Sequence, residues 1–192
     1  MIDFFDYTNE NQPAKGKLLL SEPFLNDPNF DRTVVLLCEH SDEGSFGFIL
    51  NKPSEVELNS IMDELNVVEG KAYVGGPVQH NTLHYIHRFP SLEGGQEIKN
   101  GLYWGGEFEQ LLSILQSENV TEEDIRFFVG YSGWVEGQLE EELEKKSWIV
   151  ADLNDINLVF EKSGDDLWKK ALRNLGGKFS IYSNYPTDPR LN

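Results

Sequence analysis

Short apolar runs separated by turn residues predict a chain rich in β-strands. The runs at residues 32–40 (RTVVLLCEH) and 45–50 (SFGFIL) flank the turn-rich segment SDEG, which is the pattern of a β-hairpin. Further runs with strand character lie at residues 17–20, 72–74, 82–89, 98–104, 125–131, 148–151 and 156–160. Their clustering favours pairing between neighbours along the chain.

Helical spacing of apolar residues is clearest after Pro53. Ser54 and Glu57 match a capping box, in which the two side chains satisfy free backbone N–H groups at the start of a helix. The apolar positions that follow at helical spacing are Leu58, Ile61, Met62 and Leu65. This pattern predicts a helix over residues 54–65 with one buried stripe.

The same spacing predicts helices over residues 108–115, 135–143 and 167–175, and Gly176 ends the last of them. Strands grouped in hairpins, with helices interspersed irregularly, favour an α+β fold over a regular alternation of strands and helices. We therefore expect a mixed, largely antiparallel β-sheet flanked by helices.

No linker or internal repeat divides the chain, and 192 residues are enough to bury a hydrophobic core in one domain. The polar segment TNENQPAKG separates an aromatic cluster at the start from the first predicted strand. We expect an N-terminal extension over residues 1–15 and a single domain over residues 16–192.

Charge narrows the range of partners. The chain has 33 acidic residues against 16 Lys plus Arg, a formal net charge of −17. Affinity for DNA comes largely from cationic side chains that neutralise phosphates, so this surface disfavours direct binding to nucleic acid. An acidic surface that keeps the protein soluble is the simpler interpretation.

Other features predict a cytoplasmic protein. Cys38 is the single cysteine, which excludes an intramolecular disulfide and fits a reducing compartment. The first residues lack a basic leader, and no apolar run approaches the roughly 20 residues of a membrane-spanning helix. The turn at residues 75–77 (GGP) lacks the lysine and spacing of a phosphate-binding loop, so no cofactor is expected.

The phrase GYSGWVEGQLEEELEKK, residues 130–146, raises the question of a serine nucleophile. A predicted strand leads to Ser132 and a predicted helix follows, as in the nucleophile elbow of hydrolases. However, the second glycine comes one position early, Trp134 stands where a small residue is needed, and all four histidines precede Ser132. We favour a turn whose serine hydroxyl bonds nearby backbone, and a histidine-first hydrolase stays open.

Cys38 and His40 are the other candidates for chemistry. On an extended strand they share a face about 6–7 Å apart, beyond hydrogen-bond reach. A reactive thiol would need another histidine, such as His84 or His87, but a spacing of three places these two on opposite faces and weakens a metal site built from them. A thiol in the core is therefore the favoured interpretation, and no metal site is expected.

Aromatic residues in the second half of the chain admit two interpretations. Tyr103, Trp104, Tyr131, Trp134, Trp148 and Trp168 are predicted mainly as core residues, because they fall within amphipathic patterns. A ligand pocket with some of them in its wall is the alternative.

Several phrases together resemble one protein family. In order, they are GKLLLSEPFLNDPNFDRTVVLLCEHSDEGSFGFILNKP, YVGGPV, GYSGWVEGQLEEEL and a closing run toward TDPRLN. The combination is similar to the AlgH/YqgE family of bacterial proteins, from about residue 16 to the last residue. The resemblance implies a compact cytoplasmic α/β-type domain and implies no particular reaction. Members are often labelled transcriptional regulators, which describes an effect on gene expression and not a DNA-binding module.

Family-like positions in or near the glycine-rich turns are the candidates for ligand contact: Asn51, Gly75, Gly76, Ser132, Gly133, Trp134 and Gln138. We expect a non-catalytic protein that binds a small molecule or a protein partner, with an indirect regulatory effect. Two alternatives stay open. One is a hydrolase or thiol-dependent enzyme that uses Ser132 or Cys38 with a histidine such as His40, and the other is a transcriptional regulator.

Overall fold

The computed structural model describes residues 7–117, 119–162 and 164–186. The first six residues of the expected extension and the closing TDPRLN run lie outside the described residues. Within the expected extension, Tyr7 and Asn9 lie beside the strand at one edge of the sheet: the Tyr7 hydroxyl donates to Trp148 O at 2.7 Å, and Asn9 Oδ1 accepts from Val150 N at 2.9 Å. These bonds satisfy backbone groups on an edge that would otherwise be unpaired.

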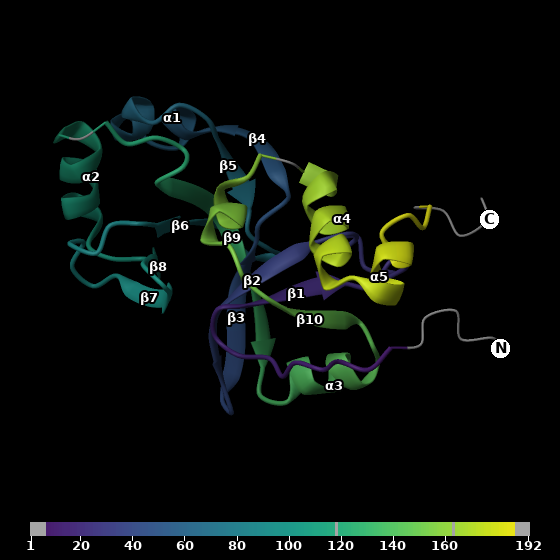
Figure 1. The fold of residues 1–192 in the computed structure, drawn as a ribbon. Coiled ribbons are helices and arrows are strands. Elements are labelled where there is room, and N and C mark those ends of the chain that lie inside the picture. The colour runs from purple at the N-terminus through teal and green to yellow at the C-terminus, as the bar shows by residue number, and fades with distance from the viewer. Residues whose placement is uncertain (1–6, 118, 163, 187–192) are drawn as a thin grey trace.

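A sheet of ten strands forms the centre of the described structure (Figure 1). Eight strands follow the order β10-β1-β2-β3-β9-β6-β8-β7, and β5 pairs with β4 and β9 beside this path. The pairs are antiparallel apart from β5–β9, so the predicted α+β class with a mixed, largely antiparallel sheet is confirmed. The strands are β1 Lys17–Ser21, β2 Val34–Ser41, β3 Gly44–Ile49, β4 Pro53–Glu57, β5 Lys71–Val74, β6 Val78–His87, β7 Gln96–Lys99, β8 Leu102–Trp104, β9 Ile125–Val135 and β10 Trp148–Asp152.

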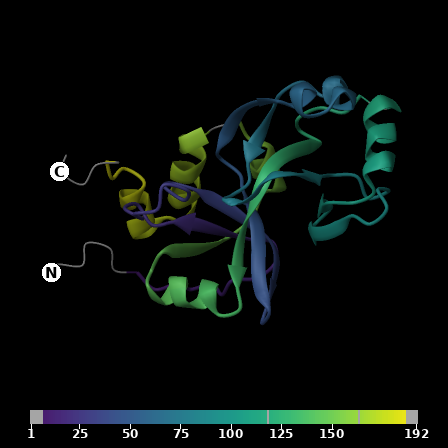
Figure 2. The same cartoon turned by 180° about the vertical axis from the view of Figure 1, so that it is seen from behind.

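Helices cover both faces of the sheet where β1 and β2 lie (Figures 1 and 2). On β1, Leu18 and Leu20 belong to the core cluster that contains Trp168, whereas Leu19 packs with Leu139 on the other face. This double burial explains why β1 and β2 read as continuous apolar runs instead of alternating ones. The helices are α1 Leu58–Ile61, α2 Phe108–Ser117, α3 Gln138–Glu144, α4 Gly164–Leu175 and α5 Gly177–Tyr182, with 3₁₀ turns η1 Asp63–Val67 and η2 Ile156–Phe160.

The helix predicted over residues 54–65 is wrong. Its first part is strand β4, in which the Ser54 hydroxyl donates to Ala72 O at 2.7 Å instead of capping a helix. Only the four residues of α1 are α-helical, and η1 follows after the extended Met62. Leu58 and Leu65 are nevertheless both buried, so the apolar spacing was a correct signal of burial. Pairing with β5, which local sequence does not reveal, decides the backbone.

Two other expectations need correction. Residues 156–160 form the 3₁₀ turn η2 and not a strand, because the Asp155 carboxylate accepts a hydrogen bond from Asn157 N at 2.9 Å and starts a turn. The expected single strand over residues 98–104 is a hairpin of β7 and β8, with Asn100 and Gly101 at its turn.

The predicted turn at Ser132 is also wrong, because β9 continues through it to Val135. The first part of β9 pairs with β6 and β5, and its last part pairs with β3, so β9 joins the two halves of the sheet. Gly130, at φ 68°, lies where these two parts meet. A change of direction within one strand, with no chain reversal, accounts for the glycines around Ser132.

Candidate functional site

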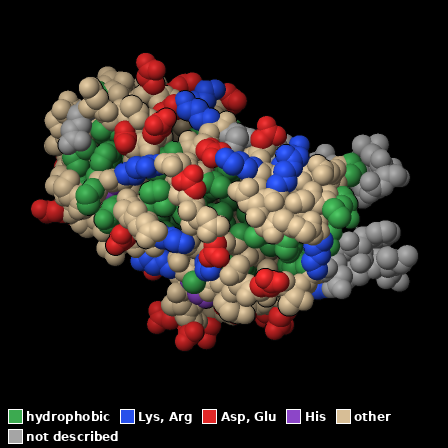
Figure 3. Space-filling model, in the orientation of Figure 1, with side chains coloured by type: hydrophobic (Ala, Val, Ile, Leu, Met, Phe, Trp, Pro, Cys, Tyr) green, Lys and Arg blue, Asp and Glu red, His purple; other side chains and the backbone are tan. Residues whose placement is uncertain are grey.

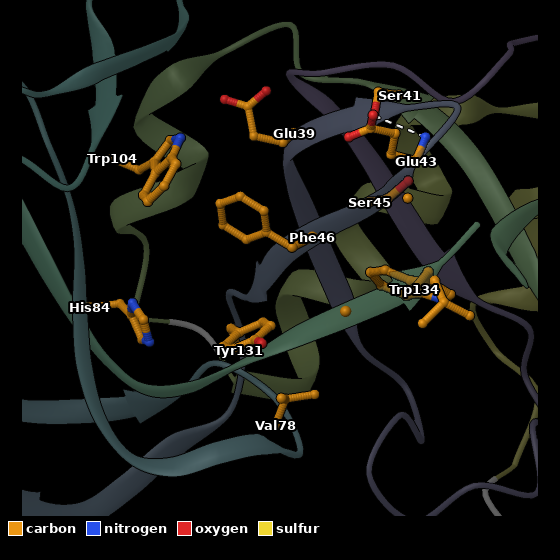
Figure 4. Close-up of a pocket in the computed structure, with 13 residues that line it drawn as sticks. Glu39, Ser41, Glu43, Ser45, Phe46, Val78, His84, Trp104, Tyr131 and Trp134 are labelled. Atoms are coloured by element: carbon orange, nitrogen blue, oxygen red, sulfur yellow. Dashed lines mark hydrogen bonds between the residues drawn. The ribbon is translucent and has the colours of Figure 1, made fainter.

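A pocket of about 630 Å³ opens where the two halves of the sheet meet (Figure 4). The β2–β3 hairpin and the last part of β9 form one side, and β6 and β8 contribute His84 and Trp104 from the other. We call this site the aromatic pocket, because the rings of Phe46, Trp104 and Tyr131 line it.

The Phe46 ring meets the rings of Trp104 and Tyr131 nearly at right angles. The ring centroids of Phe46 and Trp104 are 4.7 Å apart with an interplanar angle of 82°, and those of Phe46 and Tyr131 are 6.1 Å apart at 81°. His84 meets the Tyr131 ring edge-on at 5.7 Å. These contacts hold the aromatic rings against one another, while each ring stays partly exposed toward the pocket.

Strand register explains how the floor of the pocket forms. Glu39 pairs with Phe46 across β2–β3, and Phe46 pairs with Gly133 across β3–β9, so these positions form one row on the sheet. A Cβ atom at Gly133 would lie 3.1 Å from the Tyr131 ring. The missing side chain at position 133 therefore leaves the floor open beneath the aromatic rings.

A β-bulge at Cys38 brings Glu39 into this row. The register of β2 against β3 shifts between Leu37 and Glu39, so Glu39 faces the same way as Leu36 although the two are three residues apart. The expected shared face of Cys38 and His40 is consequently wrong. Cys38 belongs to the core cluster of Leu36, whereas His40 bonds Ser45 on the opposite face.

Two polar groups lie in the wall of the aromatic pocket. Thr82 Oγ1 lies 2.8 Å from both Gln79 O and His84 Nε2, and in the arrangement in which it donates to Gln79 O, His84 donates through Nε2 and keeps Nδ1 as an acceptor. Burial lowers the pKa of His84, which keeps the ring neutral near pH 7. The Trp104 indole N–H is buried and has no acceptor among the described residues.

The charge at the pocket is negative. Glu39 and Glu43 line it, and within the described chain no Lys or Arg side chain does. Lys15 approaches from outside and pairs with Glu39 at 3.5 Å, with both side chains more than a third exposed. Figure 3 shows acidic side chains gathered over the tip of the β2–β3 hairpin.

Ser132, Gly75 and Gly76 come together at a backbone crossing away from the pocket lining. Ser132 is fully buried, and its hydroxyl donates to Gly75 O at 3.0 Å. A Cβ atom at Gly76 would lie 2.4 Å from Ser132 N, and one at Gly75 would lie 2.3 Å from Gly130 O. Gly75 and Gly76 therefore let two backbone segments of this chain approach each other. This contact within the chain explains the glycines that the sequence suggests for ligand contact.

Trp134 and Gln138 belong to a polar cluster around Glu142. Glu142 Oε2 accepts from Trp134 Nε1 at 2.9 Å and from Trp148 Nε1 at 2.7 Å, and Glu142 Oε1 accepts from Gln138 Nε2 at 2.9 Å. Trp134 touches the aromatic pocket only at its edge, because its ring packs into the cluster that contains Trp148.

Asn51 forms side-chain hydrogen bonds with the backbone of this chain. Its side chain accepts from Val34 N and donates to Arg32 O, each at 2.8 Å, and it is buried. Of the residues predicted for ligand contact, Gly133 and Trp134 line the aromatic pocket, whereas Asn51, Gly75, Gly76, Ser132 and Gln138 do not.

The candidate nucleophiles lack a histidine partner. Cys38 is fully buried, and desolvation followed by the nearby Glu39 raises the pKa of its thiol. Among the described residues, no histidine forms a hydrogen bond with Cys38 or Ser132, since His40 bonds Ser45 Oγ at 2.7 Å and His87 bonds Gly105 O.

Sequence reasoning missed most of the pocket. For Trp104 and Tyr131 the sequence offers a ligand pocket as the alternative to core packing. It does not connect Phe46, Glu39 or His84 with these two residues. The available signal is the polar HSDEGS segment directly before Phe46. The sheet pairing that brings β6 and β8 opposite this hairpin leaves no local signal.

The part of the chain that the structure describes contains no group of three or more His, Cys, Asp or Glu that could hold a metal ion. None of its helices is long and apolar enough to cross a membrane.

A family model described as AlgH-like matches residues 18–180, which is most of the chain. The chain belongs to the AlgH-like family. Its AlgH-like relatives in bacteria carry the name UPF0301 protein. The relative from Cytophaga hutchinsonii is 48% identical over 181 residues, which cover 93% of this chain and 99% of the relative. The relative from Bacteroides thetaiotaomicron is 40% identical over 194 residues, covering 99% of this chain and 97% of the relative.

Solved structures share the AlgH-like fold. The crystal structure of protein DIP2367 from Corynebacterium diphtheriae has a TM-score of 0.76 at 24% identity, over 93% of this chain and 95% of that chain. The solution structure of the AlgH protein from Pseudomonas aeruginosa has a TM-score of 0.70 at 26% identity, over 93% of this chain and 98% of that chain. The predicted family is therefore confirmed, and none of these names states a ligand or a reaction.

Proposed function

We propose that this protein binds a small organic ligand in the aromatic pocket and catalyses no reaction there. The volume of about 630 Å³ is within the range of roughly 300–1,000 Å³ that is typical of small-molecule sites. Partly exposed aromatic rings form the wall, and His84 adds a neutral hydrogen-bonding group. An apolar cavity with few polar groups is the usual form of a ligand site.

The geometry favours binding over the hydrolase and thiol-enzyme alternatives. Ser132 and Cys38 are fully buried, outside the pocket lining. Ser45 lines the pocket at its edge and is hydrogen-bonded to His40, but strand register directs these two side chains, like Trp134, to the face opposite Phe46. A nucleophile must reach its substrate, and none of these groups lies on the face of the aromatic rings at which the ligand would bind.

We further propose a cytoplasmic location and an indirect regulatory effect. A net charge of −17 opposes direct contact with DNA phosphates. An effect on gene expression would then pass through the bound ligand or through a protein partner.

Titration of the full chain with a fragment library, followed by ¹H–¹⁵N NMR, tests the proposed function. Ligands should shift the amide signals of Phe46 and Gly133, and G133V should weaken their binding by at least about tenfold, because the added methyl groups enter the floor of the pocket. The backbone at position 133 has no left-handed φ and is not strained by the substitution, while the added Cβ, 3.1 Å from the Tyr131 ring, displaces that ring slightly within the pocket wall.

V67A serves as the control, since Val67 is exposed on η1 outside the lining of the pocket. Both variants are first checked for an unchanged thermal transition. Ligands that bind G133V as well as the unmodified protein, or a library with no ligand for the pocket, would contradict the proposal.

A further inference from the structure

We infer that the aromatic pocket selects a small organic cation, a molecule with a protonated or quaternary amine beside apolar groups. This inference rests on the proposed function and names the ligand class. The faces of aromatic rings are electron-rich and attract cations, and cages of several rings hold quaternary ammonium groups. The Phe46 ring stands at a steep angle to the rings of both Trp104 and Tyr131, and all three line the pocket, so a bound group can meet more than one of them (Figure 4).

The charges around the pocket separate a cation from a neutral apolar ligand. The charged side chains that line it are the carboxylates Glu39 and Glu43, and no described Lys or Arg lines it. Because His84 is neutral near pH 7, it does not offset them. The acidic side chains at the hairpin tip add to this local potential (Figure 3).

Lys15 already places a cation beside the aromatic pocket. Its ammonium group lies 3.5 Å from Glu39 Oε1, and the pair is exposed and therefore weak. A ligand cation in the pocket is attracted both by Glu39 and by the faces of the aromatic rings. Lys15 is not among the described residues that line the pocket, so it interacts with Glu39 and not with the rings. Lys15 is thus a competitor for the carboxylate, and its removal should favour an external cation.

The size of the pocket favours a small molecule as the occupant. A choline-sized cation fits within about 630 Å³ and leaves room for water. A hydroxyl group on such a ligand can form a hydrogen bond with His84 Nδ1, which has no partner among the described residues. Choline combines the charge, the methyl groups and the hydroxyl, and is therefore a suitable probe of this class.

The decisive experiment compares three molecules of nearly the same shape and different charge. Choline, neutral 3,3-dimethylbutan-1-ol and anionic 3,3-dimethylbutanoate are each titrated into the full chain, with ¹H–¹⁵N NMR as the readout. Choline should bind about tenfold more tightly than the neutral alcohol, and the anion should bind most weakly. The shifted amides should include Phe46 and Gly133.

Variants separate the local charge from the charge of the whole protein. E39Q should weaken choline binding about threefold more than it weakens binding of the neutral alcohol, whereas K15M should strengthen choline binding. E109Q removes the same charge from an exposed site on α2 and should change neither affinity by more than a small factor.

The outcomes distinguish this inference from the proposed function. Binding of the neutral alcohol that equals or exceeds that of choline would overturn the cation inference and leave the pocket as a ligand site. An equal loss of choline affinity in E39Q and E109Q would also overturn it. Absence of binding by all three molecules, together with a fragment library that finds no ligand, would overturn both.

Discussion

At the scale of single residues, Glu142 holds two tryptophans in place. One of its oxygens accepts both indole N–H groups, and the other accepts from Gln138, which in turn accepts from Val135 N at 3.1 Å. Hydrogen bonds to a charged acceptor stabilise more than neutral ones, and loss of the carboxylate leaves partly buried donors unpaired. This side chain thus fixes the end of β9 that forms the floor of the aromatic pocket.

We predict that E142A lowers the free energy of unfolding by about 2 kcal/mol, because two indole donors and one amide lose their acceptor. Urea denaturation followed by tryptophan fluorescence measures the change. E140A, at an exposed position of the same helix, should change it by less than about 0.5 kcal/mol. Equal effects of the two substitutions would show that the Glu142 cluster adds nothing specific.

At the scale of elements, the crossing of the segment after β5 over β9 depends on glycine. Gly76 has a φ of 154°, and a Cβ atom there would lie 2.3 Å from Tyr131 C. Neither backbone segment can move aside easily, because Ile49 N and Ser132 Oγ both donate to Gly75 O. The crossing sets the position of Tyr131, and so the position of one wall of the pocket.

G76A should therefore destabilise the protein by about 3 kcal/mol or more, by a backbone clash added to conformational strain. G137A is the matched control: Gly137 has a φ of 74° and open space around its Cβ position, so strain alone should cost about 1 kcal/mol. Thermal unfolding monitored by circular dichroism compares the two. A smaller loss in G76A than in G137A would refute the account of the crossing.

The elements that sequence patterns predicted correctly are those with local causes. The β2–β3 hairpin has a turn between two apolar runs, and α2 and α4 have a regular apolar stripe. The helix over residues 54–65 failed because a strand pair with β5 overrides a good capping pattern. At Ser132, glycines that indicate a turn instead allow close contact between Gly76 and β9. The aromatic pocket was missed as a unit because β3, β6, β8 and β9 meet there only after the sheet has formed.

At the scale of the whole molecule, the net charge of −17 bears on partners. We predict no binding of duplex DNA at physiological salt, whether random or promoter sequence, because few cations are available to replace the counterions of the phosphates. Gel-shift titrations at several salt concentrations provide the measurement. Tight binding that weakens steeply with salt would reveal a local cationic surface and would favour the transcriptional-regulator alternative.

The bulge at Cys38 interrupts the alternation of side-chain directions along β2. Every residue after the extra one is turned over relative to simple alternation, so the hairpin tip presents Glu39 to the pocket and sends His40 to the far side. A homologous chain with one residue fewer at this point loses the bulge, and its glutamate still pairs with the residue equivalent to Phe46, because simple alternation from Leu36 then reaches the same face. Pocket chemistry across the family therefore has to be compared through strand pairing, since a gap of one position at the bulge leaves the same side chains facing the pocket.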